Sequence, residues 1–270
     1  MQIFRISDIS DQRLTPYRSL KTRRAGQDGL FVVENIPSVK ALLASDMEIV
    51  SCVTTEKNYS SLREDAENNK KTNIDFYLME KPDIENLIGF KFHQGVMMAA
   101  KMPPKRDFSG IEKEIPCPGL IVALNGVHDP QNVGLITRNL AAFGADAMVV
   151  DKLTHEPYYR KVTRISMGSI FKTRLGYEDN MGTFLKYLKK KGTRIIVPSL
   201  SENSTSLDQA DLTGNICIVL GNEAEGASEE SLREADMLVR IPHVFEKADS
   251  LNVACASSII MYQAYVQRSL

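Results

Sequence analysis

The sequence predicts an α/β fold in two parts, a small N-terminal unit followed by a larger unit with a parallel sheet. Two observations lead to this prediction. Apolar runs of strand length alternate along the chain with segments whose apolar residues recur at helical spacing, which implies sheets covered by helices. From residue 119 onward, runs such as Leu120–Leu124 are almost wholly apolar, as is typical of a parallel sheet covered on both faces.

Composition restricts the class of protein before any motif is considered. The chain has 270 residues, of which 43% are hydrophobic and 25% charged, so a soluble globular protein with one large domain or two ordinary ones is expected. The net charge of −1 argues against a protein that coats nucleic acid in bulk, although it permits a local basic surface. No apolar run is long enough to span a bilayer, and the first residues do not resemble a signal peptide, so the cytoplasm is the expected compartment.

No metal site is expected from the residues that usually form one. The cysteines are far apart and no two have the spacing of metal ligands, so reduced and mostly buried thiols are expected. The histidines His128, His155 and His243 do not form a ligand set either.

The first 100 residues predict a small α/β domain. A polar, basic segment, Gln12–Arg24, comes first and contains no acidic residue. The following strands and helices are expected in this order: strand 30–33, helix 36–44, strand 48–54, helix 62–70, strand 74–78, helix 81–88 and strand 96–100. Residues 101–118 then contain several prolines and little periodicity, which indicates a linker.

Residues 119–270 predict the second domain, with about six strands. The expected elements are strand 120–124, helix 132–144, strand 147–150, helix 158–172, strand 175–177, helix 184–190, strand 194–197, strand 216–220, helix 228–234, strand 237–241 and a final helix opened by 249–252. In the final helix, the predicted buried residues are Leu251, Ala254, Ile259 or alternatively Ser258, Tyr262 and Val266. Polar residues gather in the loops after the strands, where open α/β sheets bind their ligands, so the site is expected between Ile216 and Gln263.

Three segments in this second domain resemble a known family. They are Asp129–Asn139 (DPQNVGLITRN), Leu220–Gly226 (LGNEAEG), and Ile241–Pro242 followed by Ser250–Val253 and a helix. Together, in this order, they resemble the SpoU (TrmH-type) RNA 2′-O-ribose methyltransferases of the SPOUT superfamily. The resemblance covers roughly residues 119–268. Residues 12–100 are more loosely similar to the substrate-binding domain often fused before it, which resembles kink-turn-binding ribosomal proteins.

The resemblance implies a fold, a cofactor and an assembly. The domain 119–270 would contain a deep trefoil knot, an exception to the general absence of knots. It would bind S-adenosylmethionine in a bent form and work as a homodimer whose active site draws on both subunits. The chain departs from the family pattern after Pro242, where His243–Asp249 replaces a Met and a Gly and makes the loop about one residue longer. Ala254 also stands where the family often has Ser.

A ribose 2′-hydroxyl is a poor nucleophile near neutral pH, so the enzyme must align an in-line displacement and manage one proton. The resemblance nominates Arg138, which we expect to hold an adjacent phosphate and stabilise the developing alkoxide, because a guanidinium rarely releases its proton. A surface arginine is the ordinary alternative for this residue. The other catalytic candidates are Asn132, Glu223, Ser250 and Asn252.

Each of these candidates also has an ordinary structural reading. Asn132 is expected to hold Arg138 in position or to form a hydrogen bond with the RNA. The structural alternative is that it caps a helix, and both roles are compatible. Glu223 pairs with Arg138, or it is a solvated turn carboxylate. Ser250 and Asn252 orient the cofactor and the ribose, whereas Ser250 or Asp249 alternatively caps the last helix. Cofactor contacts through the main chain are expected at Leu200, Gly221, Ile241 and Leu251.

The resemblance predicts an S-adenosylmethionine-dependent 2′-O-methyltransferase that acts on structured RNA. Ribosomal RNA is the expected substrate and tRNA the nearest rival. The residues expected to track RNA phosphates in the first domain, rather than form a solvated charged face, are Arg13, Arg18, Lys21, Arg23 and Arg24. A non-catalytic RNA-binding or ribosome-assembly factor is the alternative, supported only by the altered loop. A nucleotide-dependent oxidoreductase is not expected, because the chain lacks a glycine-rich phosphate loop.

Overall fold

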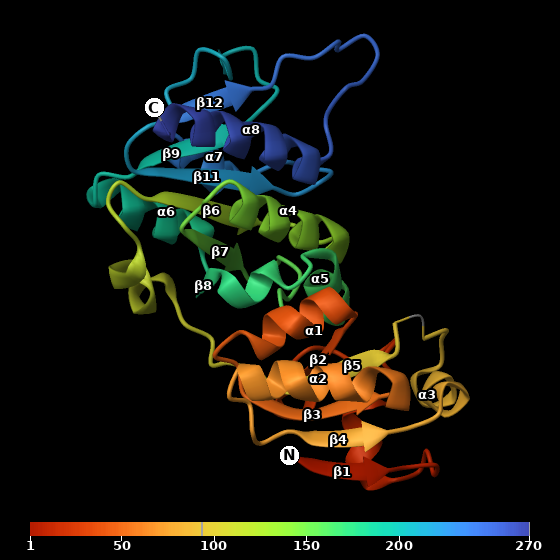
Figure 1. Cartoon of the computed structure of the whole chain (residues 1–270). Helices are drawn as coiled ribbons and strands as arrows, with labels where there is room; N and C mark the ends of the chain where they lie inside the picture. The colour runs from red at the N-terminus through yellow and green to blue at the C-terminus, as the bar shows by residue number, and fades with distance from the viewer. Residues whose placement is uncertain (93, 270) are drawn as a thin grey trace. The chain divides into compact units, whose positions relative to one another are not determined.

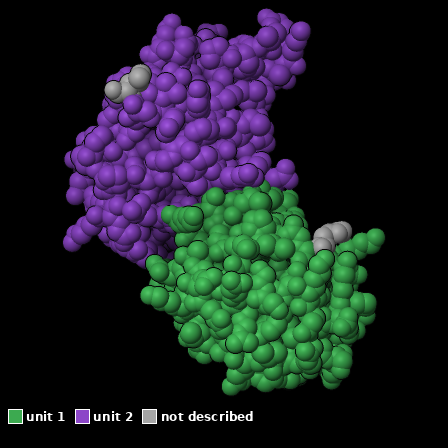
Figure 2. All heavy atoms as spheres, in the orientation of Figure 1, with its two compact units in different colours: residues 1–104, 156–172 green, residues 105–155, 173–270 purple. Residues whose placement is uncertain are grey.

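The structure is a computed structural model that describes residues 1–92 and 94–269. The chain divides into two compact units (Figure 2). Unit 1 comprises residues 1–104 and 156–172, and unit 2 comprises residues 105–155 and 173–270. The sequence placed 156–172 in the second domain, whereas its contacts place it in unit 1. Across the described ranges, no helix is long and apolar enough to cross a membrane.

Unit 1 is built on a five-stranded sheet in the order β1-β4-β3-β5-β2 (Figure 1). Its strands are β1 (Gln2–Arg5), β2 (Leu30–Glu34), β3 (Ile49–Thr54), β4 (Asp75–Leu78) and β5 (Val96–Lys101). Its α-helices are α1 (Ile36–Leu43), α2 (Glu56–Asn68), α3 (Lys81–Ile88) and α5 (Arg160–Ile165). The β1, β4 and β3 strands are parallel, and β5 runs antiparallel to both of its neighbours, β3 and β2. The sheet is therefore mixed, and the sequence analysis missed β1.

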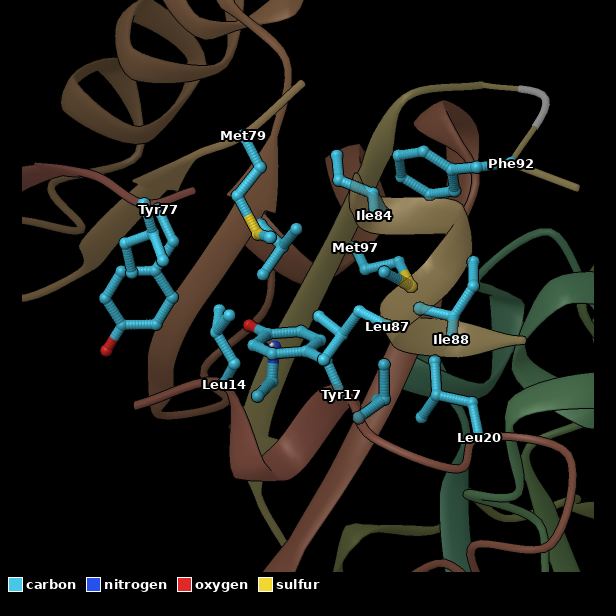
Figure 3. Close-up of a cluster of buried hydrophobic side chains, with 14 residues drawn as sticks. Leu14, Tyr17, Leu20, Tyr77, Met79, Ile84, Leu87, Ile88, Phe92 and Met97 are labelled. Carbon is cyan, nitrogen blue, oxygen red and sulfur yellow. Dashed lines mark hydrogen bonds between the residues drawn. The ribbon is translucent and has the colours of Figure 1, made fainter. Parts of the chain in front are cut away.

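The basic segment near the N-terminus is anchored in the core of unit 1. Leu14, Tyr17 and Leu20 are buried together with side chains from α3 and β5 (Figure 3). The Tyr17 hydroxyl lies 2.8 Å from Ser51 Oγ and accepts a hydrogen bond from the Ala99 N–H at 3.1 Å. Burial raises the pKa of Tyr17 well above its ordinary value. The segment 12–24, which the sequence analysis described as polar and basic, therefore also contributes side chains to the core of unit 1.

Unit 2 is built on a seven-stranded sheet in the order β10-β12-β9-β11-β6-β7-β8, and every pairing is parallel. Its strands are β6 (Leu120–Asn125), β7 (Ala147–Asp151), β8 (Arg174–Glu178), β9 (Arg194–Pro198), β10 (Thr205–Ser206), β11 (Ile216–Gly221) and β12 (Met237–Arg240). Its α-helices are α4 (Pro130–Ala142), α6 (Met181–Lys190), α7 (Glu229–Glu234) and α8 (Val253–Arg268). The predicted parallel sheet is confirmed, and its inner strand β6, which lies between β11 and β7, is buried throughout.

The helices of unit 2 bury the two faces of this sheet in the way the apolar runs predict. Residues of α6 pack with the odd-numbered side chains of the central strands, including Ile121 and Val219. Helix α4 packs against α8 (Figure 1). The trefoil knot stays a prediction.

Two helix predictions are corrected by the structure. The helix expected over 158–172 is broken, because Met167 and Gly168 adopt left-handed φ values of 54° and 78°. A Cβ on Gly168 would lie 2.4 Å from the Ala41 Cβ, so only glycine permits this close packing against α1. In α8, the predicted burial of Ala254 is confirmed, but Ile259 and Tyr262 are 40% and 55% exposed. The other buried residues of this helix are Ser257, Ile260, Met261 and Ala264.

Candidate active site

Polar side chains join the loops at the carboxyl ends of neighbouring strands in unit 2. Asn125 ends β6, and its Nδ2 donates to Asp151 Oδ2, at the end of β7, over 2.9 Å. Its Oδ1 accepts hydrogen bonds from the Ser228 N–H and the Ser231 hydroxyl at 2.8 and 3.0 Å, before and within α7. One amide therefore fixes three loops at the edge of the sheet where a ligand is expected.

Three of the predicted catalytic residues form one hydrogen-bonded chain. Asn132 Nδ2 donates to Glu223 Oε1 at 2.8 Å, and Asn132 Oδ1 accepts from Asn252 Nδ2 at 3.0 Å. These partners lie 91 and 120 residues away from Asn132 in the sequence. Asn132 is only 4% exposed, so both ends of its amide are used inside the protein. The three motifs that carry the resemblance are thereby brought together.

Glu223 closes this chain against the loop before α4. Its carboxylate also accepts from the main-chain N–H groups of Asp129 and His128, at 3.2 and 3.4 Å. Burial alone would raise the pKa of Glu223, but the hydrogen bonds from Asn132 and these N–H groups outweigh it, so its pKa lies below the ordinary value. Within this chain the carboxylate is turned toward Asn132 and not toward Arg138, so the expected pairing of Glu223 with Arg138 stays a prediction.

The helix caps also differ from the predicted ones. Asn252 is the N-cap of α8, and its Oδ1 accepts from the N–H groups of Ala254 and Cys255 at 2.8 and 3.3 Å. The capping roles suggested for Ser250 and Asp249 are therefore wrong, and Ser250 is exposed. Asp129, not Asn132, caps α4 by accepting from the Gln131 N–H at 2.8 Å.

Arg138 lies on the exposed side of α4. The next residue, Asn139, donates to the Ala254 carbonyl and the Ser257 hydroxyl, both at 3.0 Å, and so holds α4 against α8. Arg138 itself is exposed and makes no hydrogen bond or ion pair with any residue that the structure describes. The structure does not bring Arg138 into contact with the Glu223–Asn132–Asn252 chain of the same molecule.

The residues expected to bind the cofactor sit at the ends of adjacent strands. Leu200 follows β9, Gly221 ends β11 and Ile241 follows β12, and these three strands are neighbours in the sheet. Leu251 lies two residues before α8. Leu200 is 54% exposed, so its side chain is accessible at the ends of these strands. A Cβ on Gly221 would lie 2.1 Å from the Ala227 nitrogen, so the loop's own backbone already requires glycine there.

The sequence analysis missed His243, which lies beside Ile241. Its Nδ1 is 2.8 Å from the Ile241 carbonyl oxygen, which can only accept, so Nδ1 carries the hydrogen. Its ring lies 4.0 Å, between centroids, from the ring of Phe245. The Nε2 atom is buried and has no hydrogen-bond partner within 1–92 and 94–269. An orphaned acceptor next to a predicted cofactor contact fits a ligand that carries hydroxyl and amino donors, as S-adenosylmethionine does.

The predicted RNA-binding residues of unit 1 have different surroundings. Arg13 pairs with Asp11 at 2.6 Å, and Arg18 donates to the carbonyls of Ile9 and Asp11. The Arg23 side chain is only 7% exposed and pairs with Asp28. Lys21 and Arg24 are exposed and have no partner among the described side chains. Of the five, these two have the freest charge for an RNA phosphate.

No group of three or more histidine, cysteine, aspartate or glutamate side chains in the described ranges could hold a metal ion. The expectation of a metal-free site stays a prediction.

Comparisons with known proteins address the family directly. A family model described as the SpoU rRNA Methylase family matches residues 119–262. A 23S rRNA (guanosine-2′-O-)-methyltransferase of Xylella fastidiosa is 30% identical over 244 residues, which cover 88% of this chain and 97% of that protein. An uncharacterized tRNA/rRNA methyltransferase of Mycobacterium tuberculosis is 27% identical over 266 residues, covering 96% of this chain and 90% of that one.

Solved structures agree with the fold. An AdoMet-bound rRNA methyltransferase from Sinorhizobium meliloti superposes with a TM-score of 0.81 at 23% identity, covering 98% of both chains. A putative RNA methyltransferase of the TrmH family from Porphyromonas gingivalis gives 0.78 at 25% identity, covering 97% of this chain and 99% of that one. Because the family model spans more than half of the chain and the relatives span nearly all of it, this protein belongs to the SpoU rRNA methylase family.

Proposed function

We propose that this protein transfers a methyl group from S-adenosylmethionine to a ribose 2′-hydroxyl of structured RNA, and that the RNA is ribosomal. The observation that carries the proposal is the Glu223–Asn132–Asn252 chain, which joins the three family motifs at the carboxyl ends of the strands. The relative from Xylella fastidiosa is named as a 23S rRNA enzyme, which supports ribosomal RNA, whereas tRNA remains the rival substrate. Such RNA is found in the cytoplasm of bacteria, which is the compartment we propose.

Cofactor binding is proposed at the ends of β9, β11 and β12. When bound there, S-adenosylmethionine supplies an electrophilic methyl group on a sulfonium. Leu200 would cover apolar parts of the cofactor, while main-chain groups at Gly221, Ile241 and Leu251 would meet its polar atoms. The Ser250 hydroxyl, which is exposed, and the second N–H of the Asn252 amide would orient the reacting groups.

Arg138 is the proposed catalytic residue. A guanidinium keeps its proton, so its task would be to bind the phosphate next to the target ribose and to stabilise the oxygen as it becomes an alkoxide. Its exposed position and lack of a partner among the described residues suit a side chain that serves an incoming substrate. In the proposed homodimer, Arg138 would act in a site shared between two copies.

An exposed apolar stripe on α8 supports the homodimer. Ile259, Tyr262 and Tyr265 are 40%, 55% and 48% exposed and recur at helical spacing. The ring of Phe143, just after α4, packs on Tyr262 at 5.9 Å between centroids, which extends the stripe. We propose that a second copy covers it. We propose that RNA binding lies within 1–100, that 101–118 is a linker, and that the knotted methyltransferase lies within 119–270, apart from residues 156–172, which belong to unit 1.

The test combines a binding and a turnover measurement. Wild-type protein should bind S-adenosylhomocysteine in calorimetric titration and transfer tritiated methyl groups to unmodified ribosomal RNA. Arg138→Ala should keep that affinity but lose methyl transfer by about 100-fold or more. Arg233→Ala, another exposed arginine in unit 2, is the matched control and should keep both. Full transfer by Arg138→Ala would disprove its role, and methylation of tRNA alone would correct the substrate.

A further inference from the structure

Unit 1 contains a cavity of about 420 Å³ that no predicted functional residue lines. A volume of this size suits a small organic ligand or a single nucleotide. The lining comes from the end of β2, the loop between α3 and β5, and α5: Glu34, Asn35, Phe90, Lys91, Phe92, Gln94, Val96 and Arg164. Segments distant in sequence therefore converge on one concave surface within one unit.

The lining combines aromatic and polar groups. Phe92 and Val96 are buried and form an apolar floor, with Phe92 continuing into the core of the unit (Figure 3). Phe90 is half-buried, and the guanidinium of Arg160 lies 4.7 Å from its ring centroid. The Gln94 Oε1 accepts from the Ile36 N–H at 2.8 Å, which leaves its amide hydrogens for another partner.

The charge of the cavity is positive. Its single lining carboxylate, Glu34, is bound through one oxygen to Arg160 at 2.6 Å and through the other to Arg164 at 2.8 Å. Both oxygens are thereby occupied and the negative charge is neutralised. Lys91 is exposed and makes no ion pair with the described residues, and half of the Arg164 side chain is also exposed. The exposed positive charges of Lys91 and Arg164 would attract a phosphate.

A strained residue forms part of the wall. Asn35 has φ 72° and ψ 150°, a conformation that is essentially restricted to glycine. It is held there by its Oδ1, which accepts from the Ser38 N–H at 2.8 Å and caps α1, and by its Nδ2, which donates to the Arg164 carbonyl at 3.4 Å. Backbone strain of this kind concentrates at ligand sites. The strained Asn35 lines the same cavity as these aromatic and cationic side chains.

We propose that this cavity binds one unpaired nucleotide of the RNA substrate. The base stacks against Phe90 and bonds the Gln94 amide, and the phosphate lies between Lys91 and Arg164. Stacking on an aromatic ring beside cations is the usual way in which proteins hold single-stranded RNA. The proposal rests on the proposed function, because it supposes an RNA substrate, and it moves the RNA-binding surface of unit 1 away from Arg13, Arg18 and Arg23.

The test uses the full-length protein and a fluorescein-labelled single-stranded RNA of 12 nucleotides, followed by fluorescence anisotropy at several salt concentrations. Lys91→Ala should weaken binding and lower the slope of log K against log[salt] by about 0.7, the value for one phosphate contact on a single strand. Lys190→Ala, which removes an exposed lysine from unit 2, should leave the slope unchanged.

Phe90 provides a second, independent readout. Phe90→Leu keeps an apolar side chain but removes the ring, and should weaken binding about fivefold or more with the salt slope unchanged. Phe90→Tyr keeps the ring and should bind like wild type. A duplex of the same sequence should bind more weakly, because its bases are already stacked.

Several results would overturn the proposal. They are an unchanged slope for Lys91→Ala, undiminished binding by Phe90→Leu, equal binding of the duplex, or no binding of the 12-mer by wild type. Calorimetric titration of the same preparations with S-adenosylhomocysteine separates this proposal from the enzymatic one. Wild type that binds the cofactor product but not the RNA refutes only the cavity, whereas failure to bind the product counts against the methyltransferase.

Discussion

Asn132 shows how a single side chain connects segments that lie far apart in the sequence. Its amide donates to Glu223 and accepts from Asn252, and both bonds are shielded because the residue is buried. The sequence identified all three residues as members of a site through their motifs. It did not predict the hydrogen bond between Asn132 and Glu223, because hydrogen bonds between residues 91 or 120 positions apart depend on how the strands assemble, which no local pattern encodes.

The lowered pKa of Glu223 predicts a pH dependence of stability. A carboxylate whose pKa is lower in the folded than in the unfolded protein contributes stability above its unfolded value, near 4.5, and loses it as the pH falls through the folded value. We therefore expect wild type to be more stable than Glu223→Gln near neutral pH. The difference should stay constant down to about pH 5 and shrink below the unfolded value. Chemical unfolding of both proteins at a series of pH values measures it, and a difference that persists unchanged to pH 3 would contradict the assignment.

His243 carries a prediction about cofactor affinity. His243→Asn keeps a donor for the Ile241 carbonyl but removes the acceptor at the Nε2 position, whereas His243→Gln places an amide oxygen near that position. If Nε2 accepts a hydrogen bond from the cofactor, the Asn variant should bind S-adenosylhomocysteine about 3- to 10-fold more weakly and the Gln variant should recover part of the loss. Calorimetry compares the three proteins, and equal affinities would show that Nε2 has no role in binding.

At the scale of elements, the start of α8 combines a structural and a functional task. The Asn252 Oδ1 caps the helix while its Nδ2 holds Asn132. Asn252→Ala should lose both and destabilise the protein by about 1 kcal/mol. Asn252→Asp keeps the cap and most of the stability, but its carboxylate faces the Asn132 Oδ1 and should turn that amide away from Glu223. Denaturant unfolding should therefore give a lower free energy of unfolding for Asn252→Ala than for Asn252→Asp. Methyl transfer should fall in both variants. Identical stabilities of the two variants would argue against capping by Asn252.

The same helix shows why element predictions fail in detail. Four consecutive apolar residues, Ile259 to Tyr262, satisfy helical periodicity on more than one face, so spacing alone does not select the buried one. Packing against α4 and β11 selects Ile260 and Met261 instead. By contrast, β6 and β11 were placed correctly, because an unbroken apolar run of strand length is typical of the inner strands of a parallel sheet that is covered on both faces.

At the scale of the whole molecule, the exposed stripe on α8 predicts the oligomeric state. Tyr262→Glu would bury a carboxylate in the contact between two copies, which costs about 2–5 kcal/mol when such a charge is left unpaired. We expect sedimentation velocity at micromolar concentration to show a dimer for wild type and a monomer for this variant. Leu232→Glu, an equally drastic change at a 40% exposed residue of α7, should remain dimeric. A wild-type monomer, or a dimeric Tyr262→Glu, would remove the basis for a shared active site.

The overall division into two α/β units followed from strand and helix alternation, but the membership of residues 156–172 did not. That membership depends on specific tertiary contacts: Glu34 binds Arg160 and Arg164, and the Ser38 hydroxyl donates to the Thr163 carbonyl at 3.0 Å. From the local sequence alone, each of these polar residues would be expected on the protein surface. The local pattern therefore gave no reason to move the segment out of the second domain.

The chain leaves unit 1 after Pro104, returns at Glu156 and leaves again after Lys172. Two separate stretches of the gene therefore encode this unit. A chimera that exchanged only residues 1–104 with a relative would set a foreign residue at position 31 against the resident rings of Tyr158 and Phe171, which Phe31 now meets at 5.1 and 6.0 Å. Recombination between relatives should therefore give a stable protein only when residues 1–104 and 156–172 are exchanged together. Residues 31 and 34 should accordingly change in step with residues 158, 160, 164 and 171 as the lineage diverges.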